Sequence, residues 1–358
     1  MLSKQQLKDY QDWAEIVEAE LDANTAWINQ YNNYAKDMLK NEEIFREVRK
    51  LFNRWTNLHY YLTIGNVKDG EKTFDIRYLG QSVGNLKVGK DKDKQWTVLL
   101  NVDKTKNKNN VYYFDYPHGE IKDAVWNEKN GKAKEFRKFF KGNVNEKKLP
   151  RQKEHMVESA LYSEMEKTNS KNKTLCGIQP VKFANTRIHM KSSLAASDSL
   201  NDIVGQSKTG GEIDLLCRRK CDATNTRLVA IEIKDQNETA ESFDMAMKQA
   251  VAYSVFLVKL LRKSGTKTRE NWLKIFGMQN QYKDKIVIEA AVAMPEGKTA
   301  PSYGGEIIKL ASDEIVLHYI KIKNYVPGQL IKDDVIFEHS FKGLCYKKKA
   351  VKDTTAQH

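Results

Sequence analysis

Charged residues interrupt two apolar segments that otherwise have the composition of buried strands, residues 212–218 and 228–234. A strand covered on both faces is nearly continuously apolar. Yet Asp214 lies in the first segment, and Glu232 and Lys234 lie in the second. Residues two apart on a strand share a face, so Glu232 and Lys234 are expected to point the same way.

A hairpin through residues 219–227 would place Asp214 opposite Glu232. Adjacent carboxylates repel each other and raise a pKa unless a cation lies between them. Lys234 supplies a positive charge but cannot chelate, whereas oxygen ligands with open water positions suit Mg²⁺, with Mn²⁺ as a substitute. Such an ion orients a phosphate and activates water, and Lys234 would assist that water or stabilise the phosphate. These residues predict phosphodiester hydrolysis.

The flanking segments predict an α/β fold, α+β over the whole chain. Helices are expected at 154–167 and 241–261, and strands at 178–183, 212–218, 228–234 and 286–294. The order is helix, three strands, long helix, strand. A mixed sheet flanked by helices is the expected architecture.

These residues resemble the signature of the PD-(D/E)XK nuclease superfamily, which has the restriction-endonuclease-like fold. Asp214 matches its first acidic position, and Glu232-Ile233-Lys234 matches its acid-x-Lys motif. Ile213 stands where the proline of the superfamily's name would be, a common departure. The resemblance covers about residues 154–295.

The resemblance also implies roles for residues around this motif. It implies that Asp214, Glu232 and the carbonyl of Ile233 bind Mg²⁺. A further glutamate, from the preceding helix, completes the acidic cluster and the metal ligands in many members and looks like Glu158, with Glu154, one turn earlier, as its rival. Gln249, on the helix after the lysine, is similar to a glutamine found in some members.

The N-terminal part of the chain has a different pattern. Aromatic residues at helical spacing predict helices over residues 3–61, with the aromatics in the core. Strands are expected at 74–79, 96–102 and 111–114, followed by a short basic helix at 132–141. The polar segment 142–152 predicts a boundary between an N-terminal α+β domain (1–150, for recognition, oligomerisation or regulation) and the nuclease-like domain (151–300). Residues 301–358 are expected to form a C-terminal extension with a basic tail.

The charge balance favours an anionic partner. Lys and Arg number 60 against 47 Asp and Glu, a net charge of +13. Nucleic acid is the first expectation and a membrane surface the second. The longest apolar stretches are too short to span a bilayer, and the N-terminus lacks the apolar run of a signal peptide. Four cysteines in a chain this long do not form a disulfide scaffold. A cytoplasmic protein with reduced thiols is therefore expected.

Three other patterns are weaker. Residues 84–91 mimic a phosphate-binding P-loop but end in Asp91, which lacks the hydroxyl needed for Mg²⁺. Cys217 and Cys221 have no convincing second pair for a zinc site. Lysine runs at 87–94, 104–108, 132–141 and 347–349 are surface residues by default, or phosphate contacts beside a nuclease site.

The expected function is therefore a metal-dependent nuclease. DNA is favoured over RNA by analogy with similar proteins in restriction and phage defence, and a dimer or other homo-oligomer is expected. An RNA-decapping-like hydrolase is an alternative, because that family also pairs a Glu-apolar-Asp with a Glu-apolar-Lys, as in Glu212-Ile213-Asp214. A non-catalytic nucleic-acid-binding or assembly subunit is a third possibility.

Overall fold

The structure is a computed structural model that describes most of the chain. The described residues are 2–52, 58–64, 67–68, 71–103, 114–142, 153–166, 175–194, 211–222, 225–235, 242–278, 284–296, 304–325 and 335–342. Several expected features lie partly or wholly outside them: the strand residues 111–113, most of the expected boundary at 142–152, and the lysines at 104–108 and 347–349.

Three helices begin the chain: α1 (Lys4–Ala23), α2 (Ala26–Lys40) and α3 (Glu42–Phe52). Ser3 caps α1 in a capping box with Gln6, which satisfies two backbone N–H groups that helix geometry leaves without partners. Most aromatics that the structure describes in these helices are buried, as the sequence predicts: Tyr10, Trp13, Trp27, Tyr31, Phe45 and Phe52. Tyr34 is half-buried, and Trp55 lies outside the described residues. The predicted helical region is too long, however, because Tyr60 and Tyr61 belong to the strand that follows.

A first sheet, sheet A, has the strand order β10-β9-β1-β3-β4-β5-β6. These strands are β1 (Leu58–Ile64), β3 (Glu71–Tyr78), β4 (Gln81–Lys90), β5 (Trp96–Val102), β6 (Ile121–Val125), β9 (Thr186–Lys191) and β10 (Glu212–Ile213). The short strand β2 (Val67–Lys68) pairs with β3, and the short strand β8 (Lys182–Phe183) pairs with β9. Strand β1 pairs with β9 in parallel, whereas the other pairs are antiparallel. The basic helix α4 (Lys132–Gly142) lies beside β6.

A second sheet, sheet B, has the order β14-β15-β13-β12-β11-β7. Its strands are β7 (Ile178–Pro180), β11 (Leu215–Lys220), β12 (Thr226–Ile233), β13 (Val287–Pro295), β14 (Ile307–Leu310), β15 (Asp313–Lys323) and, beyond β15, β16 (Ile336–His339). The predicted hairpin is confirmed, because β11 and β12 pair antiparallel with Leu215 opposite Ile231. Strand β13 then pairs with β12 in parallel, after the crossover helix.

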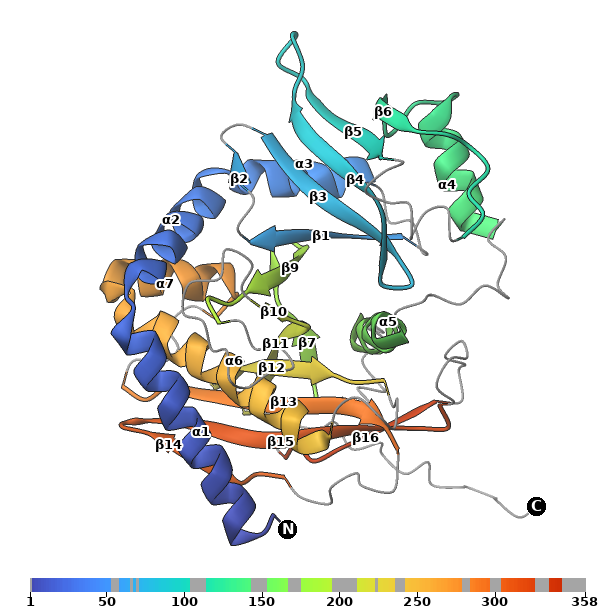
Figure 1. Cartoon of the computed structure of the whole chain (residues 1–358). Coiled ribbons are helices and arrows are strands. Elements are labelled where there is room, and N and C mark those ends of the chain that lie inside the picture. Colours follow the sequence, from blue (N-terminus) through green and yellow to red (C-terminus); the bar gives the residue numbers. More distant parts are fainter. Residues whose placement is uncertain are drawn as a thin grey trace, which may run out of the picture.

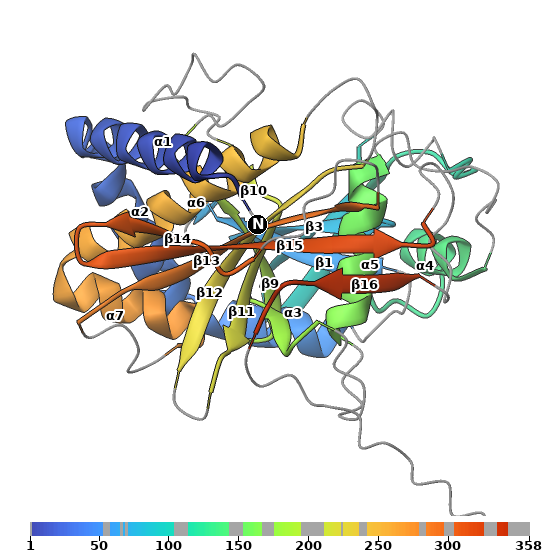
Figure 2. The same cartoon turned by 90° about the horizontal axis from the view of Figure 1, so that it is seen from below.

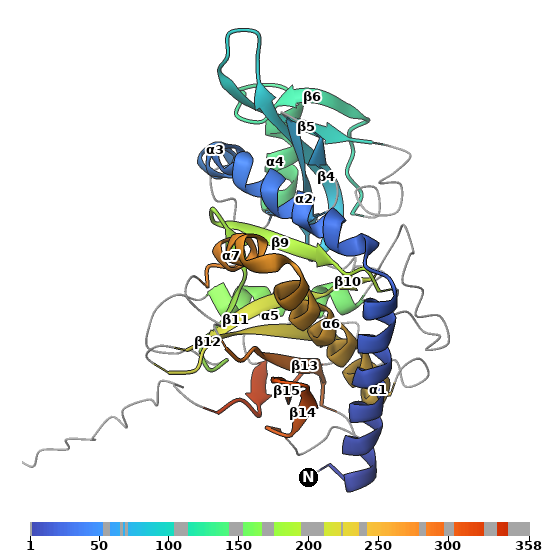
Figure 3. The same cartoon turned by 90° about the vertical axis from the view of Figure 1, so that its left-hand side faces the viewer.

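Three further helices cover the sheets: α5 (Lys153–Glu166), α6 (Phe243–Lys263) and α7 (Gly265–Ile275). Leu228 and Ala230 of β12 pack in the same core cluster as α6. Val229 and Ile231 pack in the cluster that contains α5, so the two helices cover opposite faces of this strand. The N-terminal helices continue the α6 layer: α1 lies along α6, and α2 lies against α7 (Figures 2 and 3).

Figure 1 shows sheet A in the upper half of the molecule and sheet B in the lower half. Strands β9 and β10 are the part of sheet A that lies nearest to sheet B. The predicted α/β class with mixed sheets is confirmed. The predicted strand at 212–218 is in fact two strands, because β10 pairs in sheet A and β11 pairs in sheet B. Asp214 is the residue at which the chain passes from one sheet to the other.

The pairing of strands crosses the sequence boundary expected near residue 150. Strands β9 and β10, from the expected nuclease segment, extend sheet A beyond β1. Strand β15, from the expected C-terminal extension, pairs in parallel with the whole length of β13. Within the described part of the chain, no helix is long and apolar enough to cross a membrane.

Candidate active site

Asp214 lies where the chain leaves sheet A, and its carboxylate reaches across to the neighbouring strand. Its Oδ2 accepts a hydrogen bond of 2.8 Å from the backbone N–H of Ile233, the last residue of β12. The register of β11 against β12, continued by one pair beyond Leu215 and Ile231, places Asp214 opposite Glu232. The hairpin therefore brings together two carboxylates that are distant in the sequence, as predicted.

Glu232 and Lys234 lie on one side of β12 and its extension. The Nζ of Lys234 is 3.1 Å from Oε1 of Glu232, which confirms that the two side chains point the same way. The backbone of Lys234 is held at the C-terminal end of β12, because its N–H donates to the carbonyl of Ala293 on β13. We refer to Asp214, Glu232 and Lys234 as the carboxylate–lysine cluster.

Both carboxylates of this cluster hold protons more tightly than ordinary acids do. Burial raises the pKa of Asp214 to about 7, and the Ile233 N–H and the Lys234 charge offset only part of this effect. Burial and the neighbouring Asp214 raise the pKa of Glu232 well above its usual value. Two buried acids that repel each other in this way are typical of functional sites, where a bound cation relieves the repulsion.

The donors of this cluster fit a hard divalent cation. Both acids offer oxygen ligands, which Mg²⁺ prefers. Oε2 of Glu232 is buried and has no hydrogen-bond partner among the described residues. Among the described residues, no group of three or more His, Cys, Asp or Glu side chains is arranged to hold a metal. The cluster therefore provides two carboxylates, and any further ligands would be backbone carbonyls, water or substrate oxygens.

Glu158 of α5 lies near this cluster but is held by other residues. Its carboxylate is 3.2 Å from Nδ1 of His155, 3.3 Å from Nε2 of His189 and 3.6 Å from Nη1 of Arg77. Burial alone would raise the pKa of Glu158, but these three groups outweigh it and hold the pKa well below its usual range. The charge of Glu158 still contributes to raising the pKa of Asp214.

Glu154, the rival of Glu158, lies one turn earlier on α5. Its charge contributes to raising the pKa of both Asp214 and Glu232. The Glu154 side chain is exposed, whereas Glu158 is buried. Both glutamates therefore act electrostatically on the cluster, and Glu154 lies on the side open to solvent.

Gln249 and Ile233 complete the set of predicted site residues. Gln249 is buried on α6, on the layer that covers the Glu232 face of β12, and its Oε1 has no hydrogen-bond partner among the described residues. The backbone of Ile233 contacts Asp214 through its N–H. A role for its carbonyl as a ligand stays a prediction.

A polar network that sequence patterns do not predict joins Glu158 to sheet A. His189 of β9 is buried between two acids, with Nε2 3.3 Å from Glu158 and Nδ1 2.8 Å from Glu212. Burial and the charge of Arg77 would lower the pKa of His189, but both acids outweigh them and raise it. The seven histidines of the chain show no metal-binding spacing in the sequence and were expected to be surface or core residues. The one local signal was the spacing of three residues between His155 and Glu158 on a helix.

The weaker sequence patterns form no phosphate or zinc site among the described residues. Residues 84–90 lie in strand β4, where Val83, Leu86 and Val88 are buried, and not in a loop before a helix. Cys217 and Cys221 are free thiols. Cys176 is disulfide-bonded, so the expectation of reduced thiols is wrong for this residue.

Searches of protein-family models, of curated proteins and of solved structures find no match for this chain. The carboxylate–lysine cluster must therefore be interpreted from its own chemistry.

Proposed function

We propose that this protein is a metal-dependent nuclease that hydrolyses phosphodiester bonds. The observation that carries the proposal is the convergence of Asp214, Glu232 and Lys234: two buried acids with raised pKa values beside a lysine that lies 3.1 Å from one of them. A pair of buried carboxylates that one lysine compensates only in part is costly to a fold, and a function that needs a cation accounts for it.

The arrangement of elements around the cluster supports the same proposal. Between β7 and β11 the chain forms β8, β9 and β10, which pair in sheet A. Within sheet B, helix α5 precedes the antiparallel strands β7, β11 and β12, and helices α6 and α7 then lead to β13, which is parallel to β12. This order is the one that the resemblance to the PD-(D/E)XK superfamily implies. The residues that carry the resemblance are the acidic residue between β10 and β11 and the acid-x-Lys at the end of β12, and their positions in the fold support the proposal.

The chemistry of each residue follows from its position. Asp214 and Glu232 would hold Mg²⁺ or Mn²⁺, with the Ile233 carbonyl as a further ligand and Glu154 or Glu158 completing the acidic environment. The ion, when bound, would supply a Lewis acid that neutralises phosphate charge. The Lys234 ammonium would orient the attacking water or stabilise the charge that develops on the phosphate. Gln249 would tune the cluster from α6.

The proposal extends to the substrate and setting. The net charge of +13 favours a polyanion, and DNA is favoured over RNA by the resemblance. We propose a cytoplasmic homo-oligomer that acts on DNA in restriction or phage defence. The RNA-decapping alternative needs Glu212 beside Asp214 as part of the acidic pair. It is less favoured because Glu212 forms an ion pair with His189 at 2.8 Å.

The test uses the purified full chain and labelled DNA duplex, single-stranded DNA and RNA, with Mg²⁺, Mn²⁺ or EDTA. We expect metal-dependent cleavage that Lys234→Met, Asp214→Asn and Glu232→Gln each reduce by about a hundredfold or more. Lys220→Met is the matched control, because Lys220 is an exposed lysine at the far end of the same hairpin.

Cleavage that survives in all three cluster variants and remains sensitive to EDTA would show that the nuclease site lies elsewhere. Binding of DNA without turnover in either metal would favour the non-catalytic alternative. Cleavage of RNA alone would support the processing enzyme.

A further inference from the structure

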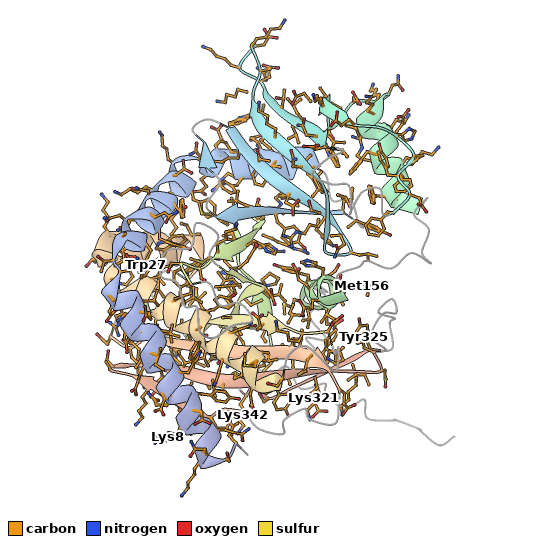
Figure 4. All side chains as sticks on the ribbon, in the orientation of Figure 1. Lys8, Trp27, Met156, Lys321, Tyr325 and Lys342 are labelled. Carbon is orange, nitrogen blue, oxygen red and sulfur yellow. The ribbon has the colours of Figure 1, made fainter. Side chains whose placement is uncertain are left out.

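The turn between β3 and β4 in sheet A lies directly against the backbone of α5. Gly80, in this turn, has φ +78°, and a Cβ added there would overlap the carbonyl oxygen of His155. Sheet A therefore touches α5 at the first turns of the helix, between Glu154 and Glu158. Figure 4 shows this region, with Met156 marking α5 below the strands of sheet A.

Arg77, three residues before Gly80, reaches from β3 to Glu158. Its Nη1 is 3.6 Å from Oε2 of Glu158. Its Nε donates a hydrogen bond of 2.7 Å to Oδ2 of Asp75, and the Ser82 hydroxyl donates to the other oxygen of Asp75. The Arg77 guanidinium also lies over the Tyr61 ring, 5.0 Å from its centroid. Arg77 is therefore fixed by groups of sheet A on one side and bound to α5 on the other.

Glu158 connects Arg77 to the residues around the proposed site. It lies on the same helix as Glu154, and both charges act on Asp214. His189 of β9 holds the opposite oxygen of Glu158 and also binds Glu212, two residues before Asp214. A continuous chain of ion pairs and hydrogen bonds thus runs from Ser82 and Asp75, through Arg77 and Glu158, to the residues that flank Asp214.

We propose that Arg77 is a positioning residue for the carboxylate–lysine cluster: it ties Glu158, and with it α5, to sheet A. The proposal rests on the nuclease function proposed above. It makes the N-terminal strands part of the active-site scaffold. An arginine suits this task because its planar fork binds two carboxylates in fixed directions, which a lysine cannot do.

Arg77→Lys is the main test, because it keeps the charge and loses the fork. We expect kcat for DNA cleavage to fall by about tenfold while KM for DNA stays within about twofold of the wild type. Arg77→Met, which also loses the charge, should lower kcat further, so that the conservative variant rescues part of the activity. Binding of Mn²⁺ alone, measured by calorimetry, should weaken by about tenfold in Arg77→Lys.

Two further variants separate positioning from general destabilisation. Asp75→Asn leaves Arg77 in place but weakens its orientation, and should lower kcat in the same direction even if Arg77→Met fails to fold. Arg219→Lys is the matched control, because Arg219 is a buried arginine whose fork binds both oxygens of one carboxylate, that of Glu289, within sheet B at the end of β11 remote from Asp214. Its kcat should stay within about twofold of the wild type.

The outcomes distinguish this inference from the nuclease proposal. A wild-type protein that neither cleaves nucleic acid nor binds Mn²⁺ would overturn both. An active wild type with unchanged kcat and Mn²⁺ affinity in Arg77→Lys and Asp75→Asn would overturn only the role of Arg77. The same holds if Arg219→Lys loses as much activity as Arg77→Lys.

Discussion

Asp214 retains its proton at a pH where an ordinary aspartate is ionised. Its pKa rises from 3.8 to about 7, mainly through burial. The folded protein therefore binds this proton more tightly than the unfolded chain does. Below about pH 4 both states are protonated. As the pH rises toward 7, the unfolded chain ionises first, so the metal-free fold loses stability across this window.

Asp214→Asn should remove this loss. The asparagine can still accept the hydrogen bond from Ile233 but carries no charge that repels Glu232. Without metal, we expect the variant to be more stable than the wild type at pH 8 by on the order of 1–3 kcal/mol, with a smaller difference at pH 5. Urea unfolding in EDTA at both pH values measures this. A difference that grows toward pH 5 would contradict the assigned sign.

At the residue scale, the sequence predicts the acids and the lysine but not their surroundings. Asp214, Glu232 and Lys234 were predictable because charge in an apolar strand is unusual and strand geometry fixes which residues share a face. Arg77 and His189 were not, because their partners Glu158 and Glu212 come from other elements. Only the tertiary structure brings those elements together.

At the scale of elements, the contact of the β3–β4 turn with α5 depends on a glycine. Gly80 combines a positive φ with close approach to His155, whereas Gly177 has a similar φ of +75° and nothing within 4 Å of an added Cβ. The two positions therefore separate backbone strain from steric overlap.

Gly80→Ala should destabilise the protein more than Gly177→Ala does. Each substitution forces an alanine into the left-handed region at about 1–2 kcal/mol. Only Gly80→Ala must also displace the first turns of α5. We expect an additional loss of about 1–3 kcal/mol there, measured by urea unfolding at a pH where both variants fold. Equal losses of unfolding free energy in the two variants would show that α5 can move away from the turn without loss of stability.

Sequence patterns predicted best those helices and strands in which apolar residues recur with a single clear period. Strands β5, β12 and β13 and helix α6 were predicted to within two or three residues. Strand β9 was missed because Arg187 and His189 are buried in it with polar partners, which removes the apolar pattern. Strand β4 was missed because its glycines and lysines suggested a phosphate loop. The break at Asp214 was missed because pairing with two different sheets leaves no local signal.

At the scale of the whole molecule, residues 1–150 lack strands that their sheet requires. Strand β1 is an interior strand of sheet A only because β9, from residues 186–191, pairs with it in parallel. Helix α1 likewise packs along α6, from residues 243–263. A fragment that ends at residue 150 would expose the edge of β1 and the apolar side of α1.

We therefore expect the fragment 1–150 to be insoluble, or to unfold without a cooperative transition, when it is produced alone. Co-expression with residues 151–358 should restore a soluble complex, because the missing strands are then supplied in trans. Circular dichroism and thermal unfolding of the purified fragment provide the measurement. A cooperative transition for 1–150 alone would support the independent domain that the composition suggested.

The parallel pairing of β1 with β9 also sets an order of events on the ribosome. Translation delivers the chain from its N-terminus, so β1 emerges well before residues 186–191 are synthesised. Until then the nascent chain carries an open strand edge that chaperones would have to shield. The interior of sheet A closes only after β9 has been synthesised and has left the exit tunnel.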